Sequence, residues 1–229
     1  FRWHAVAYFV EAVLACHDHT VFELYAYSNC AAQDDVTQRL KGYFDHWRDI
    51  RPLSDEQAAL CIRQDAIDIL VDLSGHTADN RLMVFARKPA PVQVTWLGYP
   101  NTTGLHAMDY RLTDAHAEPV GMTERYNAEK LWRLPDVFCC YTPCAERPVR
   151  TASPELAVRE TPALQKGYIT FGNFNNIAKM SPAVVALWAR LLREMPGTRL
   201  LLEAAGLDTD FLCKEVRARF AAHGVGNDQ

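Results

Sequence analysis

Two histidines occupy positions from which an imidazole can take part in chemistry. His4 precedes an apolar helical stripe, and because a helix N-terminus binds anions and favours a neutral imidazole, His4 is a candidate base or phosphate contact. His76, followed by Thr77 in DLSGHT, comes after an apolar run, and Gly75 lets the backbone turn tightly beside a ligand. A helix-capping or surface role stays open for either histidine.

The segment FGNFNNIAKMSP offers a third set of polar groups. Asn173, Asn175 and Asn176 present amides at the end of a predicted strand, and Lys179 stands just before a predicted helix whose free N–H groups can hold a phosphate. Positive charge and fixed dipoles are what a departing diphosphate needs when no metal is present. An asparagine-rich turn with a solvated lysine explains the same residues equally well.

The remaining polar clusters predict no metal centre. The HDH run at 17–19 lies at a helix end, where alternate side chains diverge, and Cys139, Cys140 and Cys144 have no histidine at a ligand interval. The sequence also lacks the GxGxxG, Walker A and GxSxG patterns. This argues against a standard dinucleotide enzyme, a P-loop ATPase and an α/β-hydrolase.

Composition narrows the class of protein. Hydrophobic residues make up 49% of the 229 residues and charged residues 23%, the profile of a globular protein with a core. The net charge of −4 is spread without long runs, so no nucleic-acid partner is predicted. No stretch is apolar enough for a membrane span, no secretion signal opens the sequence, and seven cysteines fit a reducing compartment, so a cytoplasmic location is predicted.

An alternation of helices and strands must position these residues. Apolar residues at three- and four-residue intervals mark one helix, and the capping box of Ser54 and Gln57 marks the start of another. The continuous apolar run at 67–74 is typical of a strand covered on both faces. The predicted helices cover 5–15, 34–44, 54–65 and 81–87, and the predicted strands cover 22–28, 67–74, 92–96, 109–113 and 130–135.

Such alternation predicts an α/β fold with a parallel, Rossmann-like sheet. Function in such sheets gathers in loops at the carboxyl ends of the strands, here GHTADN (75–80) and LGYPNTTG (97–104). A first lobe is predicted over 1–141, a proline-containing linker over 142–166 and an incomplete second Rossmann-like lobe over 167–229. In the second lobe, strands are expected at 168–174 and 198–204, and helices at 182–195 and 208–223.

Five blocks of the sequence resemble, in order, the catalytic region of O-linked N-acetylglucosamine transferases and their bacterial SPINDLY-type relatives. They are HAVAYFVEAVLACHD, DILVDLSGHT, FARKPAPVQVTWLGYPNTTG, MDYRLTD and FGNFNNIAKMSPAVVALWARLLREMPGTRLLLEA. The resemblance implies a two-lobed glycosyltransferase of the GT-B type. It also implies a UDP-sugar donor and inverting, metal-independent transfer to Ser or Thr hydroxyls of protein acceptors, without a cofactor.

The resemblance also suggests roles for particular residues. His4 matches a family histidine proposed as a base, Lys179 matches a lysine that touches the nucleotide diphosphate, and the two are predicted to converge across a cleft. His76 and Thr77 match a loop whose role is less defined. Leu97, Gly98 and Pro100 match a segment that borders the sugar, and Asn176 matches a contact to the diphosphate. Tyr99 and Asn175, which lie in the same two segments, are also predicted to bind substrate.

Departures from the family pattern keep other functions open. Ala5 replaces a proline, Asn101 a glycine and Asn176 a common glutamine, and Ala178 stands where tyrosine can occur. A different donor such as GDP-fucose, asparagine as the acceptor, and a non-catalytic protein-interaction module are the alternatives. The resemblance implies a tetratricopeptide array upstream, and the chain as given is expected to be a fragment that is inactive by itself.

Overall fold

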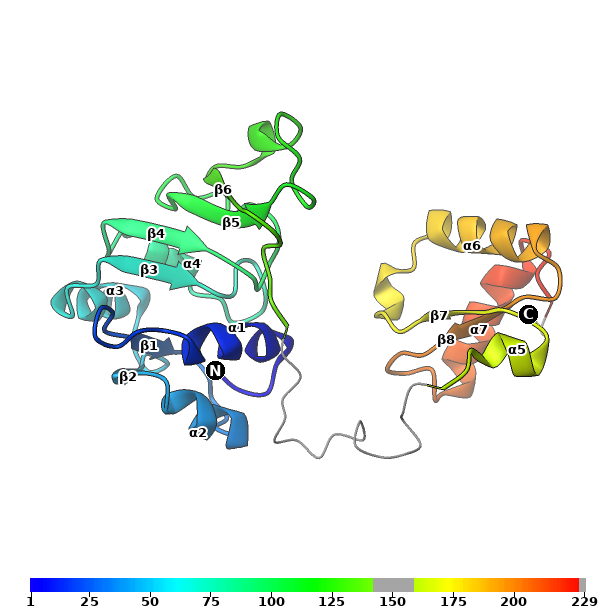
Figure 1. The fold of residues 1–229 in the computed structure, drawn as a ribbon, viewed down its shortest axis with the longest axis horizontal. Helices are drawn as coiled ribbons and strands as arrows, with labels where there is room; N and C mark the ends of the chain where they lie inside the picture. The colour runs from blue at the N-terminus through cyan, green and yellow to red at the C-terminus, as the bar shows by residue number, and fades with distance from the viewer. Residues whose placement is uncertain (142–158, 227–229) are drawn as a thin grey trace. The chain divides into compact units, whose positions relative to one another are not determined.

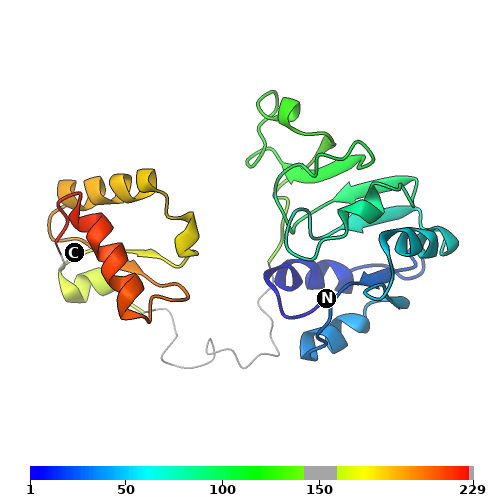
Figure 2. The ribbon, with the colours of Figure 1, turned by 180° about the vertical axis from the view of Figure 1, so that it is seen from behind.

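The computed structural model describes residues 1–141 and 159–226, and the chain divides into two compact units, Phe1–Arg147 and Pro148–Gln229 (Figures 1 and 2). Residues 142–158 of the predicted linker lie outside the described residues. The rest of that linker contains helix α5, Pro162–Lys166, which was not among the predicted helices. Proline in its first turn and Gly167 at its C-cap, with φ 74°, are signals that start and stop a helix.

The first unit begins with a two-stranded parallel sheet and two helices. Helix α1 has the predicted bounds, and α2 ends three residues earlier than predicted, where Gly42 forms the C-cap. Strand β2 was not predicted, because its sequence HWRD lacks an apolar alternation. The elements are α1 (Ala5–Ala15), β1 (Tyr25–Ser28), α2 (Asp35–Lys41) and β2 (His46–Asp49).

A four-stranded parallel sheet follows, with the order β3-β4-β5-β6. The capping box is confirmed, since the Ser54 hydroxyl accepts from the Gln57 N–H while the Gln57 side chain accepts from the Ser54 N–H. The elements are α3 (Asp55–Gln64), β3 (Ile69–Asp72), α4 (Leu82–Phe85), β4 (Val92–Thr95), β5 (Tyr110–Asp114), the 3-10 helix η1 (Glu124–Tyr126) and β6 (Lys130–Leu134). Their parallel pairing confirms the predicted α/β class.

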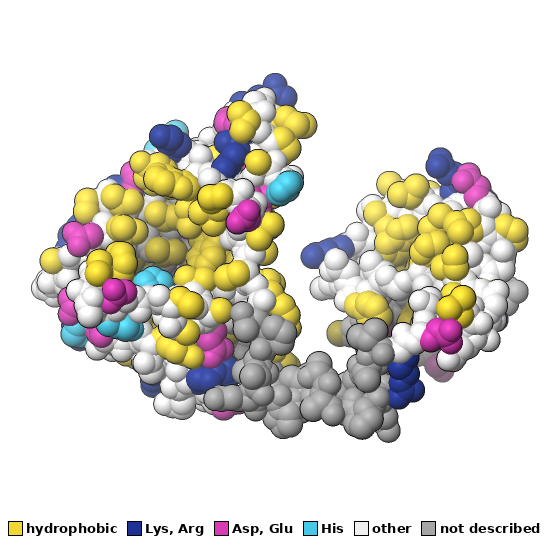
Figure 3. Space-filling model, in the orientation of Figure 1, with side chains coloured by type: hydrophobic (Ala, Val, Ile, Leu, Met, Phe, Trp, Pro, Cys, Tyr) yellow, Lys and Arg dark blue, Asp and Glu magenta, His cyan; other side chains and the backbone are white. Residues whose placement is uncertain are grey.

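One face of this sheet is covered and the other is open. Helices α3 and α4 lie behind the sheet in Figure 1 and in front of it in Figure 2, where their apolar residues form a core with Leu70. On the other face Ile69 is 58% exposed, Val71 44% and Trp132 54%, and Figure 3 shows hydrophobic side chains gathered there. The prediction that β3 is covered on both faces is therefore wrong for the described residues. An apolar run indicates that its side chains favour burial, but it does not show which segments pack against them.

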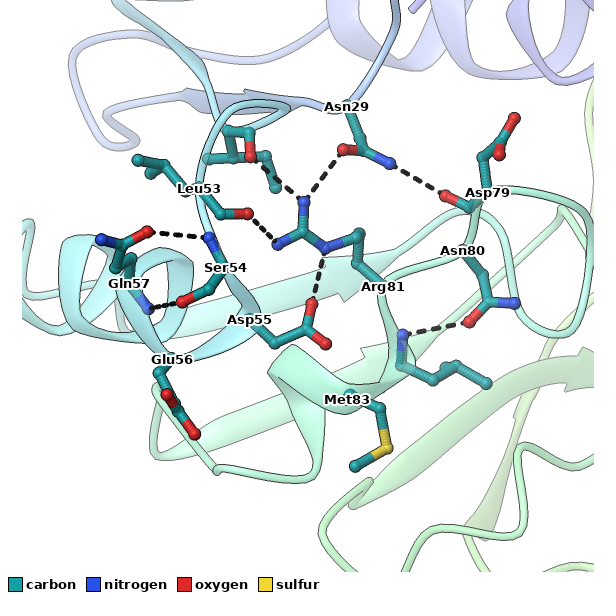
Figure 4. Close-up of polar contacts among 12 residues, drawn as sticks. Asn29, Leu53, Ser54, Asp55, Glu56, Gln57, Asp79, Asn80, Arg81 and Met83 are labelled. Atoms are coloured by element: carbon teal, nitrogen blue, oxygen red, sulfur yellow. Dashed lines mark hydrogen bonds and ion pairs between the residues drawn. The ribbon is translucent and has the colours of Figure 1, made fainter.

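Arg81 links the end of the GHTADN loop to the first sheet (Figure 4). Its guanidinium donates to the Asp55 carboxylate at 2.7 Å, to the Asn29 side chain at 3.0 Å and to backbone carbonyls of Ile50 and Leu53. The Asn29 amide donates in turn to the Asp79 carbonyl at 3.0 Å. One planar side chain thus fixes where the loop ends, because its forked donors reach acceptors in two separate segments, at Asn29 and at 50–55.

The second unit packs two parallel strands with two helices that are longer than α5. Ser181 caps α6 by accepting from the Val184 N–H, and Pro182 occupies the first turn, as predicted. Its core brings together residues such as Ala189 and Leu192 of α6 with Phe220 of α7. Besides α5, the elements are β7 (Thr170–Asn173), the 3-10 helix η4 (Ile177–Lys179), α6 (Pro182–Glu194), β8 (Arg199–Leu202) and α7 (Asp210–Ala221). Within the described parts of both units, no helix is long and apolar enough to traverse a bilayer.

Candidate active site

Asp72 holds together the carboxyl ends of β3 and β4. One oxygen of its buried carboxylate accepts from the Ser74 N–H at 3.0 Å, and the other accepts from the Gly75 N–H at 2.9 Å and the Thr95 hydroxyl at 2.8 Å. A carboxylate that accepts several hydrogen bonds in a buried place is a rigid anchor. The GHTADN loop therefore starts from a fixed backbone position beside the end of the neighbouring strand.

The GHTADN loop and the residues just before it pack closely against the LGYPNTTG loop. A Cβ added at Gly98 would lie 2.0 Å from the Leu73 carbonyl oxygen, and one at Gly75 would lie 2.4 Å from the Tyr99 Cβ. Gly75 also has a φ of 52°, and Leu97 adopts a φ of 74°, which a non-glycine residue rarely does. Two glycines and one strained leucine thus set the distance between the loops.

His76 is exposed at the tip of this assembly and is held in one orientation. Its Nε2 lies 3.0 Å from the Thr103 carbonyl oxygen, and its ring meets the Tyr99 ring edge-on with centroids 5.5 Å apart. A carbonyl can only accept, so Nε2 carries a proton and Nδ1 holds the lone pair in the neutral imidazole. Thr77 donates its hydroxyl to the Ser74 carbonyl at 2.8 Å, so this side chain supports the loop.

Helix α1 packs over the same strand ends and brings His4 with it. Its apolar face shares a cluster with Leu73, Trp96 and Leu97, the residues that begin the two loops. His4 is exposed at the N-cap, and its Nδ1 accepts from the Val6 N–H at 3.3 Å. The capping alternative is therefore what the structure contains. In this state the neutral ring carries its proton on Nε2 and offers a donor to a ligand.

Capping and chemistry at His4 can be separated by the substitution His4→Asn. Asparagine is a favoured N-cap, so α1 should keep its start, whereas the imidazole is lost. We expect the thermal midpoint of the full-length protein to change by less than about 2 °C and its catalytic rate to fall at least about 10-fold. Circular dichroism melting and a rate assay measure the two. If the catalytic rate of the variant is unchanged, His4 serves only as a helix cap.

A small cavity adjoins Tyr99 and Pro100. Its volume of about 60 Å³ has room for one or two waters but not for a sugar, and its wall includes the buried ion pair of Arg111 and Glu118. The Glu118 Oε2 atom is buried and has no hydrogen-bond partner among the described residues. The residues that line the cavity thus support the LGYP segment. The predicted contacts of this segment with a sugar remain predictions.

In the second unit the asparagine-rich turn is ordered by its own side chains. The Asn173 side chain accepts from the Asn175 N–H at 3.1 Å, and the Asn175 side chain accepts from the Asn176 N–H at 3.0 Å. Asn176 caps η4 by accepting from the Ala178 N–H at 2.9 Å, and Lys179 ends η4, exposed, two residues ahead of the cap of α6. The turn presents an ammonium group beside a helix N-terminus. Because His4 lies in the other unit, the predicted convergence of the two residues stays a prediction.

A family model described as Glycosyl transferase family 41 matches residues 1–142, which hold α1 and both loops. The chain belongs to this family. Similar proteins are named "Probable UDP-N-acetylglucosamine--peptide N-acetylglucosaminyltransferase", with SPINDLY of Arabidopsis thaliana 45% identical over 96% of this chain and 23% of that protein. SPINDLY of Solanum lycopersicum is 45% identical over 95% of the chain and 22% of the relative. The family 41 chain thus spans about a quarter of these relatives' length.

A solved structure agrees with the family assignment. A mutant of the Thermobaculum terrenum O-GlcNAc transferase superposes with a TM-score of 0.87 at 40% identity, covering 98% of this chain and 41% of that one. A likeness at this identity over nearly the whole chain confirms the predicted fold, a glycosyltransferase of the GT-B type. The family that the sequence blocks suggested is therefore confirmed.

Other sites considered in the family 41 sequence gain no support as metal centres. His17 contacts the Val13 carbonyl at 2.8 Å, whereas His19 lies 3.1 Å from the Asp45 carboxylate, so the two rings serve different partners. Over residues 1–141 and 159–226, no three His, Cys, Asp or Glu side chains are grouped to hold a metal ion. Cys139 and Cys140 are free thiols, and Cys144 lies outside the described residues.

Sequence reasoning missed two carboxylates of this candidate site, Asp72 and Glu129. Asp72 ends an apolar strand, and a lone acidic residue there is a signal that was open to use. Glu129 is buried, 5% exposed, and accepts hydrogen bonds from Thr102 and Thr103, which lie 27 and 26 residues away in the chain, so no local pattern indicates the contact.

Proposed function

We propose that this chain is part of an inverting glycosyltransferase that moves N-acetylglucosamine from UDP-N-acetylglucosamine to Ser or Thr hydroxyls of proteins. The observation that carries the proposal is its 45% identity over 96% of the chain with a relative named for that reaction. The geometry of the first unit is compatible with it, because two interlocked loops and a helix N-terminus gather at one edge of a parallel sheet, where such folds bind ligands.

The proposed mechanism is direct displacement at the anomeric carbon by the protein hydroxyl. Lys179 and the amides near the start of α6 would stabilise the charge that develops on the departing diphosphate, and His4 would donate from Nε2 near the reacting groups. No metal or cofactor is required by this scheme, since the ammonium group and fixed dipoles supply the positive charge. Asn175 and Asn176 would keep Lys179 in place through the turn that they order.

A donor and acceptor assay on the full-length protein tests the proposal. Radiolabelled UDP-N-acetylglucosamine and GDP-fucose are each offered with protein extracts, and product linkage is read by mass spectrometry at Ser, Thr and Asn. Transfer of N-acetylglucosamine to hydroxyls, insensitive to chelator, is the expected result. Transfer of fucose, or modification of asparagine, would replace the donor or acceptor. An absence of both transfer and donor hydrolysis would favour a non-catalytic interaction module.

We also propose a cytoplasmic location and protein acceptors as partners. The location rests on cysteine usage, because the described cysteines include free thiols such as Cys16 and Cys213 rather than disulfides. An upstream tetratricopeptide region is proposed from the family resemblance alone. Sequencing of the complete reading frame and fractionation of cells test these two points.

A further inference from the structure

The buried carboxylate of Glu129 sits where it can reach the LGYPNTTG loop. Glu129 immediately precedes β6, whose first residue Lys130 is paired with Tyr110, which is in turn paired with Val94 near the end of β4. This staggered register brings the start of β6 level with the last residues of β4. A side chain at the start of one strand can therefore contact the loop that leaves another.

Glu129 fixes the backbone of that loop through charge-assisted hydrogen bonds. Its Oε1 accepts from the Thr103 N–H at 2.6 Å and from the Thr103 hydroxyl, and its Oε2 accepts from the Thr102 hydroxyl at 2.7 Å. Burial by itself would raise the pKa of Glu129, but the hydrogen bonds from Thr103 and Thr102 outweigh it and lower the pKa below its ordinary value. The carboxylate is thus ionised at neutral pH and can accept from all three donors.

The same loop orients His76. Thr103 donates its backbone N–H to Glu129, and the carbonyl of the same residue accepts from His76 Nε2 at 3.0 Å. The carboxylate and the imidazole are therefore joined through one residue. Asp72 holds the other side of His76 by accepting from the Gly75 N–H, and Tyr99 packs edge-on against the ring. With Nε2–H committed to a carbonyl, the neutral ring presents Nδ1 as a lone pair.

The two histidines of this site are held in complementary states. His4 uses Nδ1 to accept the Val6 N–H and offers Nε2–H, whereas His76 uses Nε2–H and offers Nδ1. An imidazole can remove a proton only through an unprotonated nitrogen. Of the two, His76 is therefore the ring that the protein holds ready to accept a proton.

We propose that Nδ1 of His76 accepts the proton of the attacking acceptor hydroxyl, and that Glu129 is a positioning residue that holds His76 in this state through Thr103. The proposal rests on the proposed transferase function. In the step, the hydroxyl proton moves to Nδ1 as its oxygen bonds to the anomeric carbon. The bond from that carbon to the diphosphate oxygen breaks, and its electron pair leaves with the UDP.

Steady-state kinetics of the full-length protein test the proposal with four variants. His76→Ala should lower kcat about 100-fold with little change in donor KM, the size of effect expected from a lost general base. Glu129→Leu should lower kcat about 10-fold or more, and Glu129→Gln, which keeps an acceptor for Thr103, should recover to within about 3-fold of the parent. Glu124→Gln, a substitution of a glutamate that pairs with Arg133, is the matched control and should leave kcat unchanged.

Two further readouts distinguish positioning from a structural role. In the His76→Ala background, Glu129→Leu should change kcat by less than about 2-fold, because a residue that acts through the imidazole has nothing left to position. Added imidazole should restore part of the rate of His76→Ala. Should Glu129→Leu fail to fold, Thr103→Val removes one hydrogen bond to the same carboxylate and should lower kcat in the same imidazole-dependent way.

The outcomes separate the two proposals. An active parent protein with unchanged kcat in His76→Ala, or with additive effects of His76 and Glu129, overturns the inference and leaves the transferase function standing. A parent protein that neither transfers nor hydrolyses any nucleotide sugar overturns both. Loss of donor binding in His76→Ala, seen as a raised KM with unchanged kcat, would assign His76 to substrate binding and overturn its role as proton acceptor.

Discussion

Lys179→Met is expected to lower the kcat of the full-length protein by about 100- to 1,000-fold, the cost of losing a charged group that stabilises a developing anion. Methionine keeps the length and apolar stem of the side chain while removing the ammonium group, so η4 and its asparagine turn should persist. The donor KM should change less than kcat, because the charge on the diphosphate grows as the glycosidic bond breaks. Initial rates at saturating donor measure the effect.

A matched control lies in the same unit. Lys214 is also an exposed lysine, on α7, and Lys214→Met removes the same charge from a place outside the candidate site. Its kcat should stay within about 2-fold of the parent, because a surface charge away from the reacting groups contributes little. Equal losses in the two variants would mean that net charge, and not the position of Lys179, governs the rate.

Gly98→Ala is the second substitution with a large expected effect. The new Cβ would meet the Leu73 carbonyl oxygen at 2.0 Å, its carbon at 2.6 Å and the Ser74 Cα at 3.0 Å, and backbone atoms cannot rotate away as a side chain can. One of the two loops must therefore move. A shift of this size next to a reacting centre can cost about 100-fold in rate, and overpacking costs about 1–3 kcal/mol.

Hydrogen-exchange mass spectrometry and kcat together check this prediction. Peptides covering 70–80 and 95–105 should exchange faster in Gly98→Ala, since the amides bound by Asp72 lie in the displaced segment. Gly121→Ala is the control, because Gly121 has a φ of 82° but open space around its added Cβ. It should show only the local strain of a left-handed alanine, about 1–2 kcal/mol, and normal exchange at both loops. Unchanged exchange in Gly98→Ala would contradict the tight approach of the loops.

Much of the fold was predictable because local signals agreed with the tertiary structure. The spacing of apolar residues predicted the observed bounds of α1, and the capping box predicted the start of α3. Both signals arise from residues within the helix itself or its first turn. Strand β2 was missed because its four residues are stabilised by pairing with β1 rather than by an apolar pattern of their own. The exposure of Ile69 and Val71 was also beyond local reasoning, because coverage depends on which segments pack on a face.

The candidate site divides in the same way. Sequence reasoning proposed His4, His76 and the two loops as candidates, because glycine and histidine after a strand are recognisable in one short segment. It did not find Glu129, whose contacts with the LGYPNTTG loop depend on the register between β4, β5 and β6. Nor could it tell which nitrogen of each histidine bears the proton, since that depends on the Val6 N–H in one case and the Thr103 carbonyl in the other.

The sharing of one carboxylate by two strand ends has a consequence for protein engineering. Asp72 accepts from the backbone at the start of one loop and from Thr95, the last residue of the strand that leads into the other, so the two loops share this anchor. If GHTADN were grafted with Asp72, or LGYPNTTG with Thr95, separately into another scaffold, the carboxylate or the hydroxyl would be buried without the other as its partner. The two loops, Asp72 and Thr95 therefore have to be transferred together. Chimaeras that carry all of them should fold, whereas chimaeras that carry only one loop should not.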